Sequence, residues 1–433
     1  MLKQKLTRGK GVHKNVPPLK RRNMNKIYED FFQLIKSSLR NETPLIEDNI
    51  DWVEVLRLSS VHEVVPLIYK SAYKIPSFQL ADLNFTQYFK KVSMQIVYSQ
   101  IKRAHRFLQI YEQFNKEGIK ILVFKGIILR ELYPIPEERI SADEDLLIEL
   151  KSLKQAIKIL EDNNMERALS EEEEADVYHY FCRQTGLHLE LHTALFGDKS
   201  DINKKMEEVF STVFQDADTI NINNVDVNTF SVDKHFLYII CHAIKHFVSC
   251  GTGIRQICDI SMYINKYYEI INWDYIWKEI INLGYDTLLV NLLQIAIDYL
   301  GLDENKIVYP KDKNEYYINT EDLIQDIMEG GIYGTSTQAR LNSANMSLDA
   351  LNKESKSKIK SNIAAIFPKS ENLKRRYKYL EKYPVLLPVA WGSRILTYSK
   401  ERGSLSNVGT SAKETIKVGN KRIDLLKEYK LIE

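Results

Sequence analysis

The stretch from Ile119 to Leu150 constrains the fold of this 433-residue chain more than any other part of the sequence. It contains two short apolar runs, Ile121 to Phe124 and Leu146 to Ile148. Apolar runs of this length, bounded by turn residues, are typical of buried strands. Between them, Ile127 to Leu132 has the composition of a short helix, which a following proline ends. The sequence therefore predicts a strand, a glycine turn, a helix, a loop and a second strand.

Two aspartates precede the second predicted strand with one residue between them. Because side chains two apart on a strand share a face, Asp143 and Asp145 project together while Glu144 points away. Neighbouring carboxylates repel, and a cation between them or contact with water relieves that repulsion. One interpretation is a divalent metal site at a sheet edge, where Gly126 lets the backbone approach a phosphate. The alternative is a solvated turn, which acidic residues favour.

A second strand signal lies further along the chain, at Leu187 to His192. The leucines of this segment take one face, and His188, Glu190 and His192 take the other. Strict alternation of this kind predicts a half-buried strand. Its polar face either belongs to a functional site or lines the solvated side of an edge strand. The segment from Asn221 to Phe230 also alternates and predicts one further strand.

A helix is predicted around His235 to Phe247, and it carries two histidines four residues apart. His242 and His246 therefore share a face, and Cys250 follows four residues later. Histidine and cysteine at such spacing can bind zinc, so a zinc-dependent hydrolase is one hypothesis. The sequence offers no fourth ligand at a characteristic spacing, which weakens that hypothesis.

Composition excludes several classes of protein. With 44% hydrophobic residues, a chain of this length can bury a substantial core and form two or three lobes. Its longest apolar stretch, Leu288 to Leu300, is interrupted by polar residues, and the basic N-terminus has no apolar run behind it. We therefore expect no membrane span and no signal peptide. Four cysteines without the spacing of a disulfide framework predict a cytoplasmic protein.

The charge is unevenly distributed. The first 22 residues hold eight of the 60 basic residues and no acid, so the remainder has 52 basic against 58 acidic residues. A mildly acidic body argues against a large nucleic-acid-binding surface, because phosphate contacts dominate such binding. The basic tail could contact RNA or DNA. A disordered leader, or a chain that starts at Met24, explains its composition equally well.

The order of these motifs resembles the uncharacterised nucleotidyltransferase family, a branch of the polymerase-beta-like nucleotidyltransferase superfamily. The residues that carry the resemblance are Lys125, Gly126, Tyr133, Pro134, Arg139, Asp143 and Asp145. The later segments GLHLELH, HAIKHFVSCGTGIRQICDI, IFPKSENLKRRY and YPVLLPVAWGSR look like the same family. The similarity spans most of the chain beyond its basic tail.

The resemblance implies an α+β fold, with a small mixed nucleotidyltransferase sheet embedded in a mostly helical protein. It implies transfer of a nucleoside monophosphate from an NTP, such as ATP, to an acceptor hydroxyl on a small molecule, sugar, protein or RNA, with release of pyrophosphate. The expected cofactor is two Mg²⁺ ions, with Mn²⁺ as the alternative.

The same resemblance implies roles for individual residues. Asp143 and Asp145 would bind the metal, and Glu190 would be the third carboxylate, either as a ligand or as the base for the attacking hydroxyl. Lys125 and Gly126 would contact phosphate. Arg139 is a candidate for the pyrophosphate end.

The helix that carries His242 is also expected to cap the nucleotide site. In this interpretation Lys245 and Arg255 face the triphosphate and Asp259 orients them, while the alternative is a salt-bridged helix pair. The wider superfamily has Gly-Ser where this chain has Lys125-Gly126, so a serine contact to phosphate is missing. A nucleotidyltransferase-fold binding or regulatory protein without turnover is therefore the competing hypothesis.

The predicted organisation has five parts. We expect a basic, disordered tail at 1–23, an N-terminal helical lobe at 24–117 and the nucleotidyltransferase core at 118–231. A helical lobe at 232–310 would close the nucleotide site, and 311–433 would form a mostly helical C-terminal region. Its last helix, from Ala412 to Tyr429, has mixed charge and is expected to be exposed.

Overall fold

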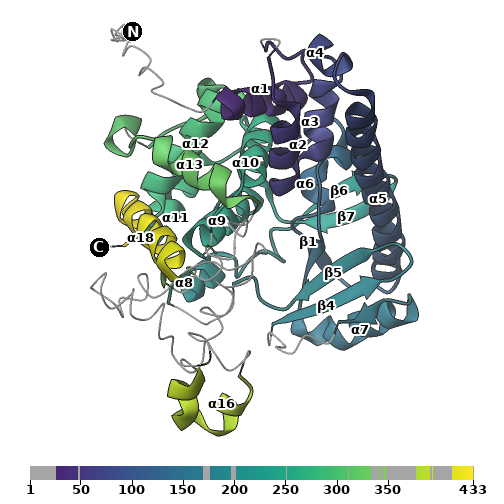
Figure 1. Ribbon diagram of the computed structural model, residues 1–433. Coiled ribbons are helices and arrows are strands. Elements are labelled where there is room, and N and C mark those ends of the chain that lie inside the picture. Colours follow the sequence, from purple (N-terminus) through teal and green to yellow (C-terminus); the bar gives the residue numbers. More distant parts are fainter. Residues whose placement is uncertain are drawn as a thin grey trace, which may run out of the picture.

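A computed structural model provides the fold of this chain (Figure 1). It describes residues 26–46, 49–168, 176–196, 201–249, 251–310, 312–332, 377–390 and 412–432, together with 340, 343, 346, 347 and 393. The basic segment at 1–23 and Cys250 lie outside the described residues. The boundaries of the five predicted parts stay a prediction.

Helices form the first described part of the chain. They are α1 (Lys26–Arg40), α2 (Trp52–Val61), α3 (Val65–Ala72), α4 (Pro76–Gln79) and α5 (Leu83–Lys116). Asp51 and Asp82 cap α2 and α5 by accepting hydrogen bonds from backbone N–H groups of the first turn. The long α5 runs along the outer side of the sheet (Figure 1).

A five-stranded mixed sheet follows, and it confirms the predicted α+β class. Its strands are β1 (Ile121–Val123), β2 (Glu144–Ile148), β3 (Glu166–Arg167), β4 (Val177–Cys182) and β5 (Leu187–His192). Their order is β1-β2-β5-β4-β3, and β2 and β5 are parallel while the other pairs are antiparallel. The short helix α6 (Ile127–Arg130) lies in the connection between β1 and β2, and α7 (Leu153–Asp162) follows β2.

The two faces of this sheet have different environments. One face, with Leu146 of β2 and Leu189 of β5, packs in a hydrophobic core with α5 and α7. The opposite face, with Leu122 of β1 and Leu147 of β2, packs against the helical part of the protein. Because alternate residues of a strand point to opposite faces, Asp145 and Glu190 project from the face that looks toward these helices.

A two-stranded hairpin stands where the sequence indicates one strand from Asn221 to Phe230. It consists of β6 (Asp218–Ile222) and β7 (Val225–Thr229). The two residues between the strands, Asn223 and Asn224, have φ angles of 48° and 66°. Asparagine tolerates this left-handed conformation, which two-residue hairpin turns require, so the single-strand prediction was wrong.

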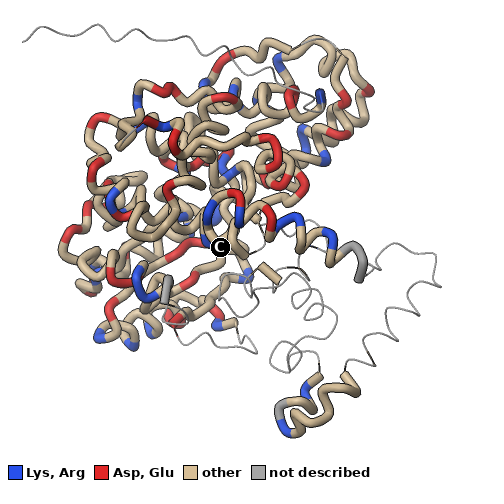
Figure 2. The backbone as a smooth tube through the Cα atoms, turned by 90° about the vertical axis from the view of Figure 1, so that its left-hand side faces the viewer, with Lys and Arg blue, Asp and Glu red and all other residues tan. Residues whose placement is uncertain are grey.

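Helices complete the described chain. They are α8 (Asp201–Val209), α9 (Val232–Ser249), α10 (Ile254–Tyr267), α11 (Trp273–Leu283), α12 (Asp286–Leu300), α13 (Glu321–Gly330), α16 (Tyr379–Lys382) and α18 (Ala412–Glu428). The expectation of an exposed final helix was wrong, because Leu425 and Leu426 of α18 are buried and Arg422 pairs with Asp326 of α13. In the view of Figure 2, basic and acidic residues of the described chain are interspersed.

No helix in the described part of the chain has both the length and the apolar character that crossing a membrane requires.

Candidate active site

The centre of the site is set by the register of two parallel strands. Asp145 of β2 lies directly opposite Glu190 of β5, and His192 follows on the same face of β5. The Nε2 atom of His192 is 3.3 Å from Asp145 Oδ1 and 3.3 Å from Glu190 Oε2. One ligand atom from each of the three residues lies within 4.8 Å of the other two. Two carboxylates and an imidazole on adjacent strands thus converge on one point.

Lys125 supplies a positive charge to this cluster. Its Nζ lies 2.6 Å from Asp145 Oδ1. Burial alone would raise the pKa of Asp145, but the ammonium of Lys125 and the ring of His192 outweigh burial and lower the pKa to about 2. Burial likewise opposes the charge of Lys125, whereas Asp145 raises its pKa well above the ordinary value. Asp145 and Lys125 therefore form a charged pair at neutral pH.

Asp143 has a different environment from Asp145. Burial raises the pKa of Asp143 to about 6, and the nearby charges of Asp145 and Glu190 contribute to this rise. The charges of Asp145 and Glu190 thus act on the pKa of Asp143, as expected for carboxylates that lie near one another. The compact three-residue group, however, consists of Asp145, Glu190 and His192. Asp143 lies beside this group, at the start of β2.

Glu144 lies beneath the site, on the face of β2 opposite to Asp145. It is buried and pairs with the buried guanidinium of Arg130. It also accepts a hydrogen bond of 2.6 Å from the backbone N–H of Ile127, at the start of α6. Gly126 has a φ of +51°, and a Cβ atom there would lie 1.9 Å from Glu144 Oε2. The glycine is therefore required by close contact with Glu144, whatever else its backbone binds.

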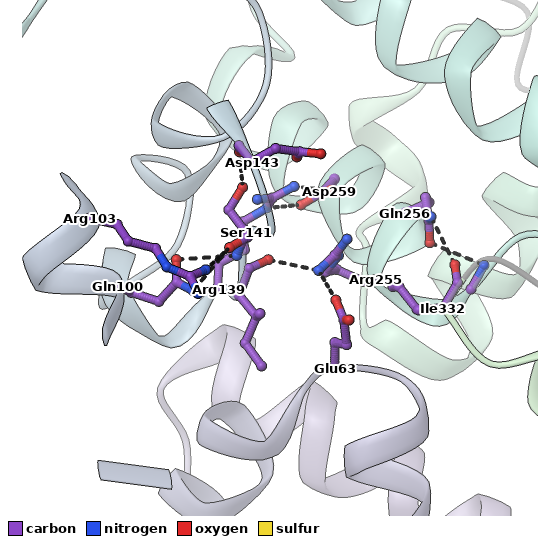
Figure 3. Close-up of polar contacts among 12 residues, drawn as sticks. Glu63, Gln100, Arg103, Arg139, Ser141, Asp143, Arg255, Gln256, Asp259 and Ile332 are labelled. Atoms are coloured by element: carbon purple, nitrogen blue, oxygen red, sulfur yellow. Dashed lines mark hydrogen bonds and ion pairs between the residues drawn. The ribbon is translucent and has the colours of Figure 1, made fainter. Parts of the chain in front are cut away.

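Arg139 and Arg255, two of the predicted nucleotide contacts, are bonded to protein carboxylates (Figure 3). The Nε and one terminal nitrogen of Arg139 each donate to Asp259, at 2.7 Å, and Tyr133 also donates to Asp259. The Nη1 atom of Arg255 lies 2.6 Å from Glu63 Oε2. The expectation that Asp259 orients Arg255 and Lys245 was therefore wrong, because Asp259 is occupied by Arg139 and Tyr133.

Lys245 is exposed on α9, with its Nζ 5.8 Å from the centre of the Phe196 ring. His242 and His246 of α9 lie on the side of the site where Lys125 lies. His242 Nε2 is 3.1 Å from His246 Nε2 and 3.4 Å from Lys125 Nζ. Burial and the charge of Lys125 lower the pKa of both imidazoles. An ammonium this close disfavours a zinc ion on His242, and the third proposed ligand, Cys250, lies outside the described residues.

The donor set of the central cluster fits a divalent cation. Oxygen ligands from carboxylates suit Mg²⁺ and Mn²⁺, and imidazole nitrogen extends the choice to softer metals. Asp145 Oδ2 is buried and has no hydrogen-bond donor within the described part of the chain. A buried carboxylate oxygen of this kind is costly unless a cation or a donor satisfies it. Asp145, Glu190 and His192 could therefore hold one ion, with Asp143 beside it.

Some residues of this site were not assigned from the sequence. His192 was placed on the correct face of its strand but received no role, because a histidine two residues from a glutamate does not reveal its distance to Asp145. The sequence also did not predict a role in the site for His179 of β4 or for Arg130. The Nδ1 atom of His179 lies 3.4 Å from Glu190 Oε1. The one available signal for Arg130 was the apolar surroundings of Glu144, which demand a buried partner.

Comparison with known proteins identifies the family of this chain. A model of the uncharacterised nucleotidyltransferase family matches residues 48–301, which is more than half of the chain and includes every residue of the central cluster. The comparison with curated proteins found no match. Among solved structures, the chain is similar to an antigenic nucleotidyltransferase-like protein from Paracoccidioides brasiliensis, at 15% identity and a TM-score of 0.30, over 45% of this chain and 90% of that one. The family predicted from the sequence is confirmed, and the chain belongs to the uncharacterised nucleotidyltransferase family.

Proposed function

We propose that this protein transfers a nucleoside monophosphate from an NTP to an acceptor hydroxyl, with Asp143, Asp145 and Glu190 as the metal-binding carboxylates and His192 as a further ligand. The observation that carries this proposal is the pairing of Asp145 with Glu190 across β2 and β5, beside a buried oxygen that has no donor. Mg²⁺ is the proposed ion because carboxylates dominate the donor set, and Mn²⁺ is the alternative.

The proposed roles follow from charge and position. A bound divalent ion would neutralise charge on the phosphate that is transferred. Lys125 is the closest side-chain cation to the cluster, so it is the proposed phosphate contact, and Lys245 is a second cation on the neighbouring helix. Glu190 accepts the proton of the attacking hydroxyl, because its carboxylate is 27% exposed whereas that of Asp145 is fully buried.

Arg139 and Arg255 receive positioning roles in this proposal. Arg255 donates to the carbonyl of Ile140 at 2.8 Å as well as to Glu63, and Ile140 lies just before Asp143. Arg139, further back in the same loop, is fixed to α10 through Asp259. The two arginines thus attach the Asp143-bearing loop to α10, and reaching a triphosphate would cost them these bonds.

A second candidate is a nucleotide-binding protein without turnover. It is favoured by the contact between Lys125 and Asp145, because the ammonium already balances the charge that a metal ion would balance. Catalysis is favoured by the convergence of Glu190 and His192 on the same point.

Calorimetry and pyrophosphate release separate these candidates. Titration of the full chain with each NTP, with and without Mg²⁺ or Mn²⁺, is expected to show metal-dependent binding, and pyrophosphate release is then measured with cell extract as the source of acceptor. Asp145→Asn and Glu190→Gln should abolish pyrophosphate release while the far-UV circular dichroism stays unchanged. The matched control is Glu149→Gln, one residue beyond β2, where the carboxylate pairs with exposed Lys151 and the rate should not change. Retained turnover in both site variants contradicts the metal assignment, and metal-dependent binding without pyrophosphate release supports the second candidate.

A further inference from the structure

A cavity of about 460 Å³ adjoins the carboxylates of the candidate active site. Asp143 and Glu190 line it, whereas Lys125 and His242 are not among the described residues that do. The carboxylates therefore lie between two different environments. On one side are the basic side chains of Lys125, His242 and His246, and on the other side is the cavity.

The walls of the cavity come from several parts of the chain. The loop before β2 contributes Ser141, strands β4 and β5 contribute His179 and His188, and α5 contributes Arg103. Glu63, two residues after α2, and Ala168, directly after β3, also line it. Elements far apart in the sequence thus build a hollow next to Glu190.

Glu63 is held in the cavity wall by unusual backbone geometry and an ion pair. Its φ of +53° is uncommon for a residue other than glycine and costs about 1 kcal/mol or more. The Oε2 atom of Glu63 accepts a hydrogen bond of 2.6 Å from Arg255 (Figure 3). A carboxylate fixed in this way is a preorganised hydrogen-bond acceptor with a third of its side-chain surface still exposed.

Arg103 is the arginine among the described residues that line the cavity, and its buried Nε has no hydrogen-bond partner in the described part of the chain, whereas Arg255 does not line the cavity but bonds to Glu63 in its wall. Arg103 donates to the carbonyl of Ser141 at 3.2 Å, and Arg255 bonds to Glu63 and to the carbonyl of Ile140 (Figure 3). Recognition of a phosphate needs arginine or lysine groups that point at it. The described wall presents three carboxylates, Glu63, Asp143 and Glu190, together with imidazoles and short apolar side chains such as Ala142, and this excess of acidic groups disfavours a phosphate. That mixture suits hydroxyl groups and the carbon faces between them.

We propose that this cavity is the acceptor site and that it binds a small, uncharged polyhydroxyl molecule of sugar or cyclitol type. This inference rests on the proposed nucleotidyl transfer and adds the class of acceptor to it. Cavities of 300–1,000 Å³ hold small molecules, and a volume near the lower end of that range suits one or two sugar rings. The outer wall binds the hydroxyl groups that do not react, and Glu190 lies where the reacting hydroxyl enters.

The reaction at this site balances without a further reagent. The acceptor oxygen forms a bond to the α-phosphorus, and the bond from that phosphorus to the oxygen bridging to the β-phosphorus breaks. Pyrophosphate leaves with the electron pair of that bond, and the hydroxyl proton passes to the Glu190 carboxylate. His179 Nδ1, 3.4 Å from Glu190 Oε1, holds that carboxylate toward the cavity.

The first test compares acceptors with the wild-type chain. Each of ATP, CTP, GTP and UTP is incubated with Mg²⁺ and one probe: glucose, N-acetylglucosamine or myo-inositol as neutral polyols, glucose 6-phosphate as the anionic match, or a short RNA with a 3′-hydroxyl. Pyrophosphate release and mass spectrometry of the product are the readouts. Nucleotidylated neutral polyol is the expected result. Product from the phosphorylated sugar or RNA alone, or from no neutral probe although the chain binds Mg-NTP, overturns the inference. Absence of nucleotide binding overturns the proposed function and the inference together.

The second test uses variants of the outer wall. His188→Ala and Glu63→Gln should raise the KM for the neutral acceptor roughly tenfold, the effect of losing one good hydrogen bond, and change kcat by less than about twofold. His105→Ala on the exposed face of α5 is the matched control and should change neither constant. Equal kinetic constants for wild type, His188→Ala and Glu63→Gln overturn the assignment of the cavity. A fall in kcat with unchanged KM does so too, because it indicates a purely structural role.

Discussion

Replacing Gly126 by alanine tests the close contact between Gly126 and Glu144 beneath the site. The φ of +51° and ψ of −115° at this position are adopted readily by glycine alone, so an alanine is strained by about 1–3 kcal/mol. In addition, its Cβ would lie 1.9 Å from Glu144 Oε2 and 2.6 Å from Glu144 Cδ. Real atoms do not approach this closely, so the Glu144 carboxylate has to move.

The cost of moving Glu144 follows from its partners. The carboxylate would lose the hydrogen bond from Ile127 and its pairing with Arg130, whose guanidinium is 2% exposed. Separating a buried ion pair costs roughly 3–5 kcal/mol, because one charge is left without a partner. Strain and ion-pair loss together predict a destabilisation of about 4–8 kcal/mol, which is comparable to the whole stability of many domains.

Urea and thermal unfolding measure this effect against a matched control. Gly284→Ala places alanine at a φ of +73° with no atom within 4 Å of the new Cβ, so it tests left-handed strain alone. We expect it to cost about 1–2 kcal/mol. Gly126→Ala should lower the unfolding midpoint far more, or yield no soluble protein. Equal midpoints for the two variants would refute the inferred role of Glu144.

Two further predictions concern buried charges away from the site. Burial lowers the pKa of His62 from 6.5 to about 4, so the unfolded chain binds the extra proton first as the pH falls, and stability should decrease from pH 6.5 down to about 4, by about 3 kcal/mol from this residue. His62→Gln should flatten the pH dependence of the unfolding midpoint over that window, and an unchanged slope would contradict the assignment. Asp326, which is fully buried between Arg340 at 3.0 Å and Arg422 at 2.6 Å, should cost about 3–5 kcal/mol when replaced by asparagine. Glu329→Gln on the same helix removes an exposed pair with Lys421 and should cost less than about 1 kcal/mol in the same urea titration; similar losses in both variants would show that burial is not the cause.

The elements predicted well are those whose pattern is local. Alternation placed β5 at Leu187–His192, and the short apolar runs placed β1 and β2. The hairpin at Asn223 and Asn224 was missed because its two strands read as one alternating run, although two adjacent asparagines are a turn signal. Which strands become neighbours is not a local property, so the parallel pairing of β2 with β5 required the structure.

The same distinction explains which site residues could be predicted. Asp143 and Asp145 share a face because of strand geometry alone, and Glu190 came from the family resemblance. The partners of Arg139 and Arg255 are 120 and 192 residues away in the chain, so no local pattern distinguishes an arginine that binds substrate from one that positions a loop. For the same reason the cavity beside Glu190, with walls from α5, β4 and Glu63, could not be predicted from the sequence.

Three consecutive acidic residues illustrate how the fold divides similar side chains among different tasks. Glu144 points to the face of β2 that packs with α5 and α7, where Arg130 neutralises it, and Asp145 points to the opposite face, where Lys125 does so. Asp143 has no ion pair with the described residues, and burial raises its pKa to about 6. Asp143, the one of the three without an ion pair in the described part of the chain, lines the cavity together with Glu190. A cation bound there would gain more from Asp143 than from a carboxylate that already has a cationic partner.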